Sequence, residues 1–519
     1  MPVKHNGRNA EAMAQENDAA TVKKLTFMEQ VKSFSRYFWV ANSMEMFERL
    51  AFYGVRAVVG LYIVDAAARG GLELEHTTRG FIFFIWALIQ TLLPMFTGGF
   101  SDRYGYKKSL YIAFTINIAG YTMMGLASGF GGFLTGVIMV ATGTAIFKPP
   151  LHGTLAHTVD EKNSSLGWGF FYQLVNIGGF IGPFVAGQLR IIDWEYVFFA
   201  SAVFTAVNFL PTIFLLKDFS EETRKEKRAA GVVEKGAFAT FADSMLTLVR
   251  DTKFMIFLLI FSGFWLMFMQ LFDTFPIFIQ EWVDSRGLLH FIEHNLHMSF
   301  INADEFGNVP PEYMVNIDAG SIVLLMPLIG YFTGKFKPVV MMVVGMLIST
   351  LALVFTGINS TGGMVILGIF LFSIGEMMCS PKFSEYIGLM APPEKKALYM
   401  GYSNIPFAIG WSLAGLMSGF TYGAYSDKYM LGRRYLIEEL GLDKVFVNGL
   451  DRTEVIPTMV NHITGIDAFQ ATKILWDQYN PWITWIFFGG VGLAMTLAML
   501  IYHFWLEADK RRKDREATA

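Results

Sequence analysis

Charge and cysteine are scarce in this sequence. Only 16% of its 519 residues are Asp, Glu, Lys or Arg, whereas 53% are hydrophobic and the mean hydropathy is +0.41. Such an apolar composition excludes an ordinary soluble protein and indicates a chain that crosses a membrane many times. Cys379 is the only cysteine, so an intrachain disulfide is excluded. The formal net charge of −3 favours no partner, and no nucleic-acid partner is expected.

Motifs for ATP use and for catalysis are also missing. The sequence has no glycine-rich loop that would cradle nucleotide phosphates, so ATP-driven transport is not expected. It has no nucleophile-and-base motif, so we predict neither an enzyme nor a cofactor. His290, His294 and His297 lie at helical spacing beside Glu293, which allows a metal site. No second ligand cluster accompanies them, so a helix in a solvated loop is favoured and no metal is predicted.

Long apolar runs are plentiful instead. Crossing about 30 Å of hydrocarbon takes about 20 helical residues, and runs of this length recur about twelve times. They lie near residues 38–64, 80–100, 108–128, 132–151, 168–190, 196–216, 252–280, 319–334, 338–357, 363–388, 400–424 and 482–505. A charged stretch near 217–250 divides them equally, as in many transporters built from two halves. The sequence therefore predicts an all-α integral membrane protein with two six-helix halves.

The predicted domains follow this division. Residues 1–30 form a disordered cytoplasmic tail, 31–217 the N-terminal half, 218–250 a cytoplasmic linker, 251–507 the C-terminal half and 508–519 a second cytoplasmic tail. Two long polar segments of the C-terminal half, near 281–318 and 425–481, are predicted as solvated outer loops, with an external lid as the alternative. Within the second, "DAFQATKILWDQYNP" predicts an Asp-capped helix that ends before Pro481.

Lysine and arginine concentrate in one set of short loops. The stretches "DRYGYKK", "KDFSEETRKEKR", "GKFK", "PPEKK" and "EADKRRKDR" all fall on one side when the spans are counted. Basic loops face the cytoplasm. We therefore predict a multi-pass protein of the plasma membrane or bacterial inner membrane, with both termini in the cytoplasm and the lipid bilayer around it.

The first apolar run contains four charges, in the stretch "EMFERLAFYGVR" that begins at Glu45. At the helical period one face carries Glu45, Arg49, Phe52 and Arg56, and its edges carry Glu48 and Tyr53. Each charge costs roughly 2.5–3.5 kcal/mol at the centre of a membrane helix, so the four are expected to face a wet interior. A structural salt-bridge cluster is the alternative, but intramembrane carboxylates are by default proton or substrate sites.

This stretch resembles the first-helix signature of the proton-dependent oligopeptide transporters, a branch of the major facilitator superfamily. Further stretches resemble the same family in the same order, namely "GTAIFKPP", "FFYQLVNIGGFIGP", "FWLMFMQ", "VPPEYMVNIDAGSIVLLMP" and "GEMMCSP". The loop "GGFSDRYGYKK" matches a motif of the wider superfamily. The resemblance implies the major facilitator fold and proton-coupled import of di- and tripeptides by alternating access, with a monomer expected.

Site residues follow from the resemblance by motif. It implies that Glu45, Glu48 and Arg49 couple proton movement and that Asp102 and Arg103 act in a gate. The implied substrate-binding residues are Arg56, Tyr53, Lys148, Tyr172, Asn176, Gln270 and Glu376. Four alternatives stay open: Lys148 snorkels to the membrane interface, or Glu376 is a structural acid beside a proline. The loop of Asp102 and Arg103 reflects only the cytoplasmic bias of basic residues, or the side chains of Tyr53, Tyr172 and Asn176 hold helices together.

The sequence departs from the family pattern at several pocket positions. Thr91 stands where a second-helix tyrosine is common, and Met269 replaces the seventh-helix acid, although Asp273 lies one turn onward. Asp318 and Ala319 replace an Asn and a Pro. The alternative function is therefore transport of another small solute, such as an amino-acid derivative, an anion or a drug, on the same scaffold. A nontransporting sensor or membrane enzyme would need a catalytic constellation or a large appended domain, and the sequence shows neither.

Overall fold

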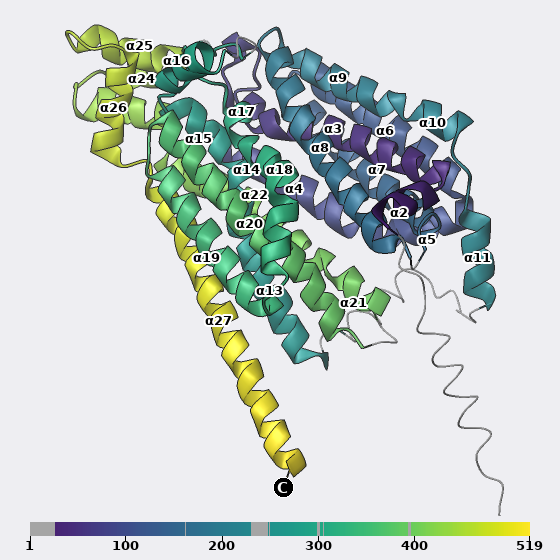
Figure 1. Ribbon diagram of the computed structural model, residues 1–519. Coiled ribbons are helices and arrows are strands. Elements are labelled where there is room, and N and C mark those ends of the chain that lie inside the picture. The colour runs from purple at the N-terminus through teal and green to yellow at the C-terminus, as the bar shows by residue number, and fades with distance from the viewer. Residues whose placement is uncertain are drawn as a thin grey trace, which may run out of the picture.

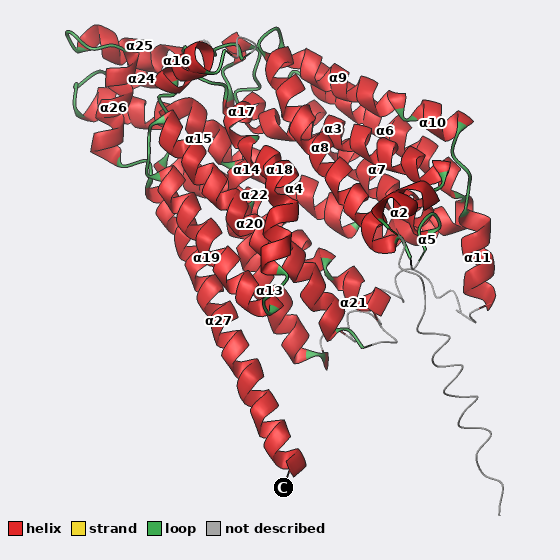
Figure 2. Cartoon of the chain, viewed as in Figure 1, coloured by secondary structure: helices red, strands yellow, loops and turns green. Residues whose placement is uncertain are grey.

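The computed structural model describes residues 26–160, 162–229, 248, 250–297, 301–304, 306–392 and 396–518. Helices make up nearly all of this part of the chain (Figure 2). Its β-type pairing amounts to an isolated bridge between Asp284 and Thr361. The all-α prediction is confirmed.

The N-terminal half consists of α3 (Arg36–Val64), α4 (His76–Leu92), α5 (Pro94–Tyr104), α6 (Tyr106–Leu126), α7 (Phe130–Ala156), α8 (Ser164–Arg190), α9 (Trp194–Val207) and α10 (Phe209–Phe214). The chain bends by 45° between α4 and α5. Pro94 accounts for the bend, because it has no N–H to donate to the preceding turn.

Glycines bring α8 against α3. A Cβ on Gly182 would lie 2.5 Å from the carbonyl oxygen of Leu50, and one on Gly178 would lie 2.6 Å from that of Met46. Any larger residue would push the two helices apart. The stretch "NIGGFIGP" therefore sets how closely α8 approaches the charged first helix.

The C-terminal half consists of α13 (Thr252–Phe268), α14 (Gln270–Asp273), α15 (Phe275–Trp282), α17 (Pro311–Val315), α18 (Ile317–Thr333), α19 (Pro338–Gly357), α20 (Gly362–Met390), α21 (Lys396–Tyr402), α22 (Asn404–Tyr425) and α27 (Ile483–Thr518). Its first span is broken at Met269 and Thr274, so α13, α14 and α15 follow one another with short interruptions.

Nine helical segments of the described chain are long and apolar enough to cross a membrane, or ten when the bent pair α4 and α5 counts as one span. Two more helices are long enough, α3 with 29 residues and α22 with 22. The charges of α3, and the glycines and hydroxyl residues of α22, lower their apolar character. With these two, the predicted set of about twelve spans is complete.

The outer faces of these helices are apolar. Leu324 and Leu328 on α18 and Leu497 and Ile501 on α27 are between 55% and 77% exposed. Large apolar side chains exposed in a row are costly in water and favourable against hydrocarbon. These helix faces therefore lie against the lipid bilayer.

The segment 425–481 corrects the loop prediction. It folds into α23 (Lys428–Glu438), α24 (Lys444–Asn448), α25 (Arg452–His462) and α26 (Ala468–Tyr479). Leu436, Val455 and Leu475 are fully buried, so these short helices share a core of their own. The Asp467 cap at the start of α26 confirms the helix predicted from the sequence. Segment 281–318 likewise contains α16 (Arg286–Asn295) and α17.

The predicted tails and linker also contain helices. The disorder prediction is wrong for residues 27–30, which belong to α2 (Phe27–Ser33), while residues 1–25 lie outside the described residues. The predicted linker begins with α11 (Ser220–Ala229), and its residues 230–247 and 249 lie outside the described residues. Between α3 and α4 is the short helix η1 (Ala67–Arg69), and α27 continues through the predicted C-terminal tail to Thr518.

The two halves lie side by side, the N-terminal half on the right and the C-terminal half on the left in Figure 1. Helices α24, α25 and α26 are at one end of the C-terminal half, and the C-terminal end of α27 projects from the opposite end (Figure 1). We call these ends the α23–α26 side and the termini side.

Candidate functional site

A cavity of about 500 Å³ lies between the two halves. From the N-terminal half it is lined by side chains of α3, α4 and α8, and from the C-terminal half by those of α13, α14, α17, α18, α20 and α22. A cavity of this size suits a small organic solute. The charged side chains that line it are Arg49, Arg56, Glu312, Asp318 and Glu376.

Aromatic side chains make up much of the cavity wall. They are Phe52, Tyr53, Phe83, Trp86, Tyr172, Trp265, Phe268, Phe272, Phe383, Phe407 and Trp411. The indole N–H groups of Trp86, Trp265 and Trp411 have no hydrogen-bond partner within the described residues. Buried tryptophans usually find a partner for this group, so these three offer donors to a bound solute.

A network of ion pairs lies on one side of the cavity, centred on Arg49. Its Nε donates to Glu48 Oε2 at 2.5 Å and lies 3.4 Å from Glu45 Oε1. Lys148 of α7 forms an ion pair with Glu45, and Thr144, one turn earlier, donates to Glu48 at 3.3 Å. The helical period places the two acids and Arg49 within one turn of α3, facing α7. The predicted coupling residues are therefore brought together.

Lys148 corrects part of the sequence-based prediction. It was predicted among the substrate-binding residues, yet it does not line the cavity and contacts Glu45 instead. Only Arg49 of this network reaches the cavity. The lysine was assigned from its motif alone, and a motif does not show which side chains reach the cavity.

Arg56 links the two halves. Its Nη2 forms an ion pair with Asp273 of α14, and its guanidinium lies 4.3 Å from the centre of the Phe83 ring. Its Nη1 has no hydrogen-bond partner in the described structure.

Arg79 of α4 also links the two halves, donating to the backbone oxygen of Asp273 at 2.5 Å and to Ser418 Oγ at 2.8 Å. Asp273 is buried and does not line the cavity, whereas Met269 one turn earlier does.

The C-terminal half contributes two neighbouring acids. Glu376 lies in the middle of α20, and Asp318 lies in the first turn of α18, within hydrogen-bonding reach of it. Ser373 donates to Asp318 at 2.6 Å, whereas Glu376 Oε2 has no partner among the described residues. Neither acid takes part in an ion pair that the structure describes, so this wall is suited to a cationic group of a solute.

The remaining predicted binding residues divide into two groups. Tyr53, Tyr172 and Asn176 line the cavity, and Asn176 also donates to the backbone oxygen of Tyr172 at 2.8 Å. Gln270 lies outside the cavity and is fully buried, with its amide donating to the backbone oxygen of Ala414 at 3.3 Å. This placement corrects the prediction for Gln270, because the break before α14 turns the side chain toward α22.

The loop between α5 and α6 carries the predicted gate residues Asp102 and Arg103. The Tyr106 hydroxyl donates to Asp102 at 3.1 Å.

The start of α6 is capped by Asp218, which accepts from the backbone N–H groups of Tyr106 and Lys107, each at 3.2 Å. Partial burial raises the pKa of Asp218, but these hydrogen bonds and those from Ser220 outweigh burial and hold the pKa below its usual value. No sequence signal pointed to Asp218, since a cap 112 residues away from its helix leaves no local motif.

Polar contacts between the halves gather toward the α23–α26 side. There Arg56 pairs with Asp273, Arg190 donates to Glu312 at 2.7 Å, and His76 lies 3.5 Å from Asp427. Glycines also bring α4 against α22: a Cβ on Gly80 would lie 2.6 Å from the Gly415 carbonyl oxygen. The cavity is therefore closed toward the α23–α26 side.

A family model settles the family of the chain. The model described as Major Facilitator Superfamily matches residues 46–289 and 287–431. The chain belongs to the major facilitator superfamily. It is a multi-pass membrane transporter, and the predicted fold class is confirmed.

Curated relatives of the chain are bacterial superfamily members. The Multidrug resistance protein MdtH of Edwardsiella ictaluri (strain 93-146) is 22% identical over 416 residues, which cover 79% of this chain and 90% of the relative. MdtH of Proteus mirabilis (strain HI4320) is 20% identical over 421 residues, with 80% and 92% covered. Identity this low indicates a shared transporter scaffold.

Solved structures of peptide transporters share the fold. A POT family transporter in complex with 5-aminolevulinic acid has a TM-score of 0.63 at 16% identity, covering 91% of this chain and 99% of that chain. Peptide transporter POT in complex with sulfate has a TM-score of 0.63 at 14% identity, with 95% and 98% covered. The nucleoside transporter NupG has a TM-score of 0.64 at 12% identity, with 90% and 100% covered. These similarities concern the fold alone.

Proposed function

We propose that this transporter imports di- and tripeptides together with protons by alternating access. The observation that supports this most is the opposition of charge in the cavity, with Arg49 and Arg56 on the N-terminal wall and Asp318 and Glu376 on the C-terminal wall. A dipeptide zwitterion carries its carboxylate and ammonium roughly 5–7 Å apart and is complementary to such a cavity.

Each end of the peptide has an unpartnered atom to meet. The Nη1 of Arg56 is a free donor for the carboxylate, and Glu376 Oε2 is a free acceptor for the ammonium group. Charge-assisted hydrogen bonds of this kind are about twice as strong as neutral ones. The tryptophan N–H groups and aromatic faces serve the peptide bond and the side chains, which differ from one peptide to another.

Proton coupling is assigned to the network around Arg49. When Glu48 binds a proton, Arg49 loses one of the two carboxylates that hold it, and its guanidinium becomes available to the cavity. Conversely, a peptide carboxylate that attracts Arg49 makes protonation of Glu48 more favourable. Proton and peptide thus stabilise the same arrangement of one side chain, which is the reciprocal linkage that coupled transport requires.

Alternating access requires the contacts on the α23–α26 side to separate while the termini side closes. The ion pairs that Arg56 and Arg190 make between the halves would break. The loop that carries Asp102 and Arg103 would help to close the termini side. We infer cytoplasmic termini, because basic loops such as the one between α5 and α6 lie on the termini side. One chain contains the complete cavity, so we propose that a monomer transports.

Uptake of labelled dialanine into proteoliposomes tests this function. An inward proton gradient should drive accumulation by the wild-type chain, and an uncoupler should abolish it. Cys379→Ser serves as a matched variant that should transport normally, since the thiol lies outside the cavity lining. Correctly folded and reconstituted protein without any proton-driven dialanine uptake would contradict the peptide assignment.

The aromatic wall favours a second candidate, transport of an aromatic organic cation. Eleven aromatic side chains line the cavity together with three acids, a combination that binds cations by π-contacts and charge. The MdtH relatives carry a multidrug resistance name. Competition separates the candidates: excess diphenylalanine should block dialanine uptake if the peptide assignment is right, whereas block by tetraphenylphosphonium alone would support the second candidate.

A further inference from the structure

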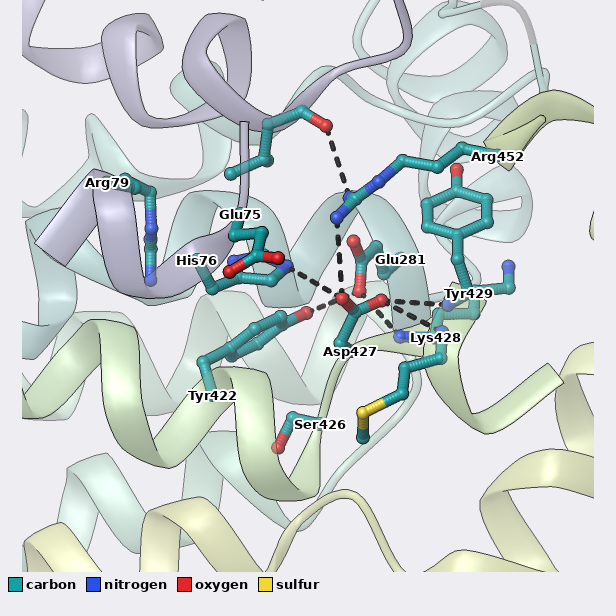
Figure 3. Close-up of polar contacts among 12 residues, drawn as sticks. Glu75, His76, Arg79, Glu281, Tyr422, Ser426, Asp427, Lys428, Tyr429 and Arg452 are labelled. Atoms are coloured by element: carbon teal, nitrogen blue, oxygen red, sulfur yellow. Dashed lines mark hydrogen bonds and ion pairs between the residues drawn. The ribbon is translucent and has the colours of Figure 1, made fainter. Parts of the chain in front are cut away.

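A second buried polar group lies on the α23–α26 side, apart from the cavity (Figure 3). It consists of His76 at the start of α4, Glu281 in α15 and Asp427 at the start of α23. One potential metal-binding atom of each residue lies within 4.8 Å of those of the other two. All three side chains are buried, with residue exposures between 2% and 8%. Neither the transport cavity nor the coupling network uses them.

His76 carries the evidence that this group binds something. Neither of its ring nitrogens has a hydrogen-bond partner within the described residues. Its Nε2 is directed toward Asp427 and lies 3.5 Å from Oδ2, beyond hydrogen-bonding distance (Figure 3). Buried polar groups are almost always partnered, so an unpartnered imidazole that faces two carboxylates indicates a ligand.

The two carboxylates are oriented by further hydrogen bonds. Tyr422 donates to Glu281 Oε2 at 2.7 Å, and the backbone N–H of Lys428 donates to the same oxygen at 3.2 Å. The cap of α23 fixes Asp427, whose Oδ1 accepts from the N–H of Tyr429 at 3.0 Å. Metal sites typically hold their ligands with outer hydrogen bonds of this type. The arrangement leaves Asp427 Oδ2 facing His76.

We propose that His76, Glu281 and Asp427 bind a divalent transition-metal ion, with Zn²⁺ as the best match. One imidazole and two carboxylates suit Zn²⁺, and three protein ligands leave a fourth position for water. Bonds from Zn²⁺ to nitrogen and oxygen are about 2.0–2.2 Å long, so the three ligand atoms would draw together around the ion.

Arg452 of α25 is the competitor for this ion. Its Nη2 lies 3.4 Å from Asp427 Oδ2, and its Nη1 donates to the backbone oxygen of Val64 at 3.1 Å. The guanidinium thus supplies the positive charge that faces Asp427 in the structure. An ion would take its place, and Arg452 would keep the Val64 contact. The other nearby guanidinium, that of Arg79, is engaged by Asp273 and Ser418.

A bound ion would act as a clamp between the halves. His76 belongs to the N-terminal half, and both carboxylates belong to the C-terminal half. With all three ligands on one ion, the α23–α26 side could not open, and transport would stop. This inhibition rests on the proposed alternating access, whereas the binding of the ion does not.

Titration of the purified full-length chain with Zn²⁺ in detergent tests the binding site. Calorimetry should show one tight Zn²⁺ site in the wild type. His76→Ala should weaken Zn²⁺ binding at least about 10-fold, because losing even a residue that hydrogen-bonds to a metal ligand costs about 10- to 100-fold in affinity. Glu281→Gln provides the same test should His76→Ala fail to fold. Arg452→Gln should tighten the site.

The matched control is the exposed pair His290 and His294, whose rings stack 4.0 Å apart on α16. Replacing both by alanine should leave the tight site intact. The metal proposal would be overturned by a wild type without a tight site, by equal affinity in the wild type and His76→Ala, or by loss of binding in the His290 and His294 variant alone.

Transport assays separate the proposed metal site from the inhibition that a bound ion would cause. Zn²⁺ should inhibit dialanine uptake by the wild type and spare His76→Ala. If Zn²⁺ binds through His76 but no dialanine is transported at all, the proposed function fails and the metal site stands. If Zn²⁺ binds through His76 and leaves wild-type uptake unchanged, the clamp is refuted.

Discussion

The two ends of the cavity differ in how the halves are joined. Toward the α23–α26 side, ion pairs cross between the halves, and Gly80 lets α4 touch α22. On the termini side, Lys253 pairs with Asp509 and Lys337 donates to Glu507 at 3.0 Å, both within the C-terminal half. The ion pairs that join the two halves thus lie on the side where the cavity is closed.

The pairs also differ in burial. The side chains of Arg56 and Asp273 are 12% and 1% exposed, whereas that of Lys337 is 73% exposed. Exposed ion pairs contribute about 0–1 kcal/mol, and removing one partner of a buried pair costs about 3–5 kcal/mol. The buried pair of Arg56 and Asp273 is therefore the stronger contact between the halves, and the exposed pair of Lys337 and Glu507 contributes little.

Asp273→Ala should give the largest effect, because it leaves Arg56 buried without its partner. A cost of about 3–5 kcal/mol is enough to invert a two-state equilibrium. Spin labels on exposed Glu195 and Val445, in the Cys379→Ser chain, should report longer distances between the halves in Asp273→Ala. Lys337→Ala should leave the distances unchanged. An unaltered distance distribution in Asp273→Ala would show that the pair does not hold the closed state.

Glu376→Gln should have the next largest effect, on binding rather than on access. Loss of a charge-assisted hydrogen bond costs about 1.5–3 kcal/mol, so the KM for dialanine should rise by roughly 10- to 150-fold. The fold should tolerate the change, since Glu376 has no cationic partner among the described ion pairs. Glu385→Gln on the same helix is the control and should keep the wild-type KM. An unchanged KM in Glu376→Gln would remove this acid from the solute site.

Asp218→Asn should give the smallest effect, because it changes a helix cap within one half. Loss of the carboxylate cap should lower stability by about 0.5–2 kcal/mol at neutral pH and leave the access equilibrium unchanged. The folded pKa lies below the ordinary value of 3.8, so the stabilisation is present above that value and is lost as pH falls through the folded pKa. The thermal unfolding temperatures of the wild type and Asp218→Asn in detergent should differ at pH 7 and converge in acid. A change in the spin-label distances between the halves would contradict this ranking.

Much of the site could be predicted because its signals are local. The charges of the first helix repeat at the helical period, which assigned Glu45, Glu48 and Arg49 to one interior. Asp273 was noticed for the same reason, one turn beyond Met269. The fold followed from the apolar runs, whose length is set by the bilayer.

The rest depends on contacts between distant segments. Trp411 faces the cavity only because of how α22 is rotated, and in the sequence it looks like an ordinary membrane residue. Asp218 caps a helix far away in the chain. Helices α23 to α25 were predicted as parts of a solvated loop because their segment is long and polar, and only the core that they share with α26 makes them stable. His76 shows no signal until α15 and α23 bring acids to it.

Glu48→Gln is the sharpest test of proton coupling at Arg49, because it removes the exchangeable proton and keeps the shape of the side chain. Gradient-driven uptake of dialanine and its exchange without a gradient should be measured in the same proteoliposomes. Driven accumulation should be lost in Glu48→Gln while exchange persists. Driven accumulation at the wild-type rate in Glu48→Gln would contradict the assignment of proton coupling to the network around Arg49.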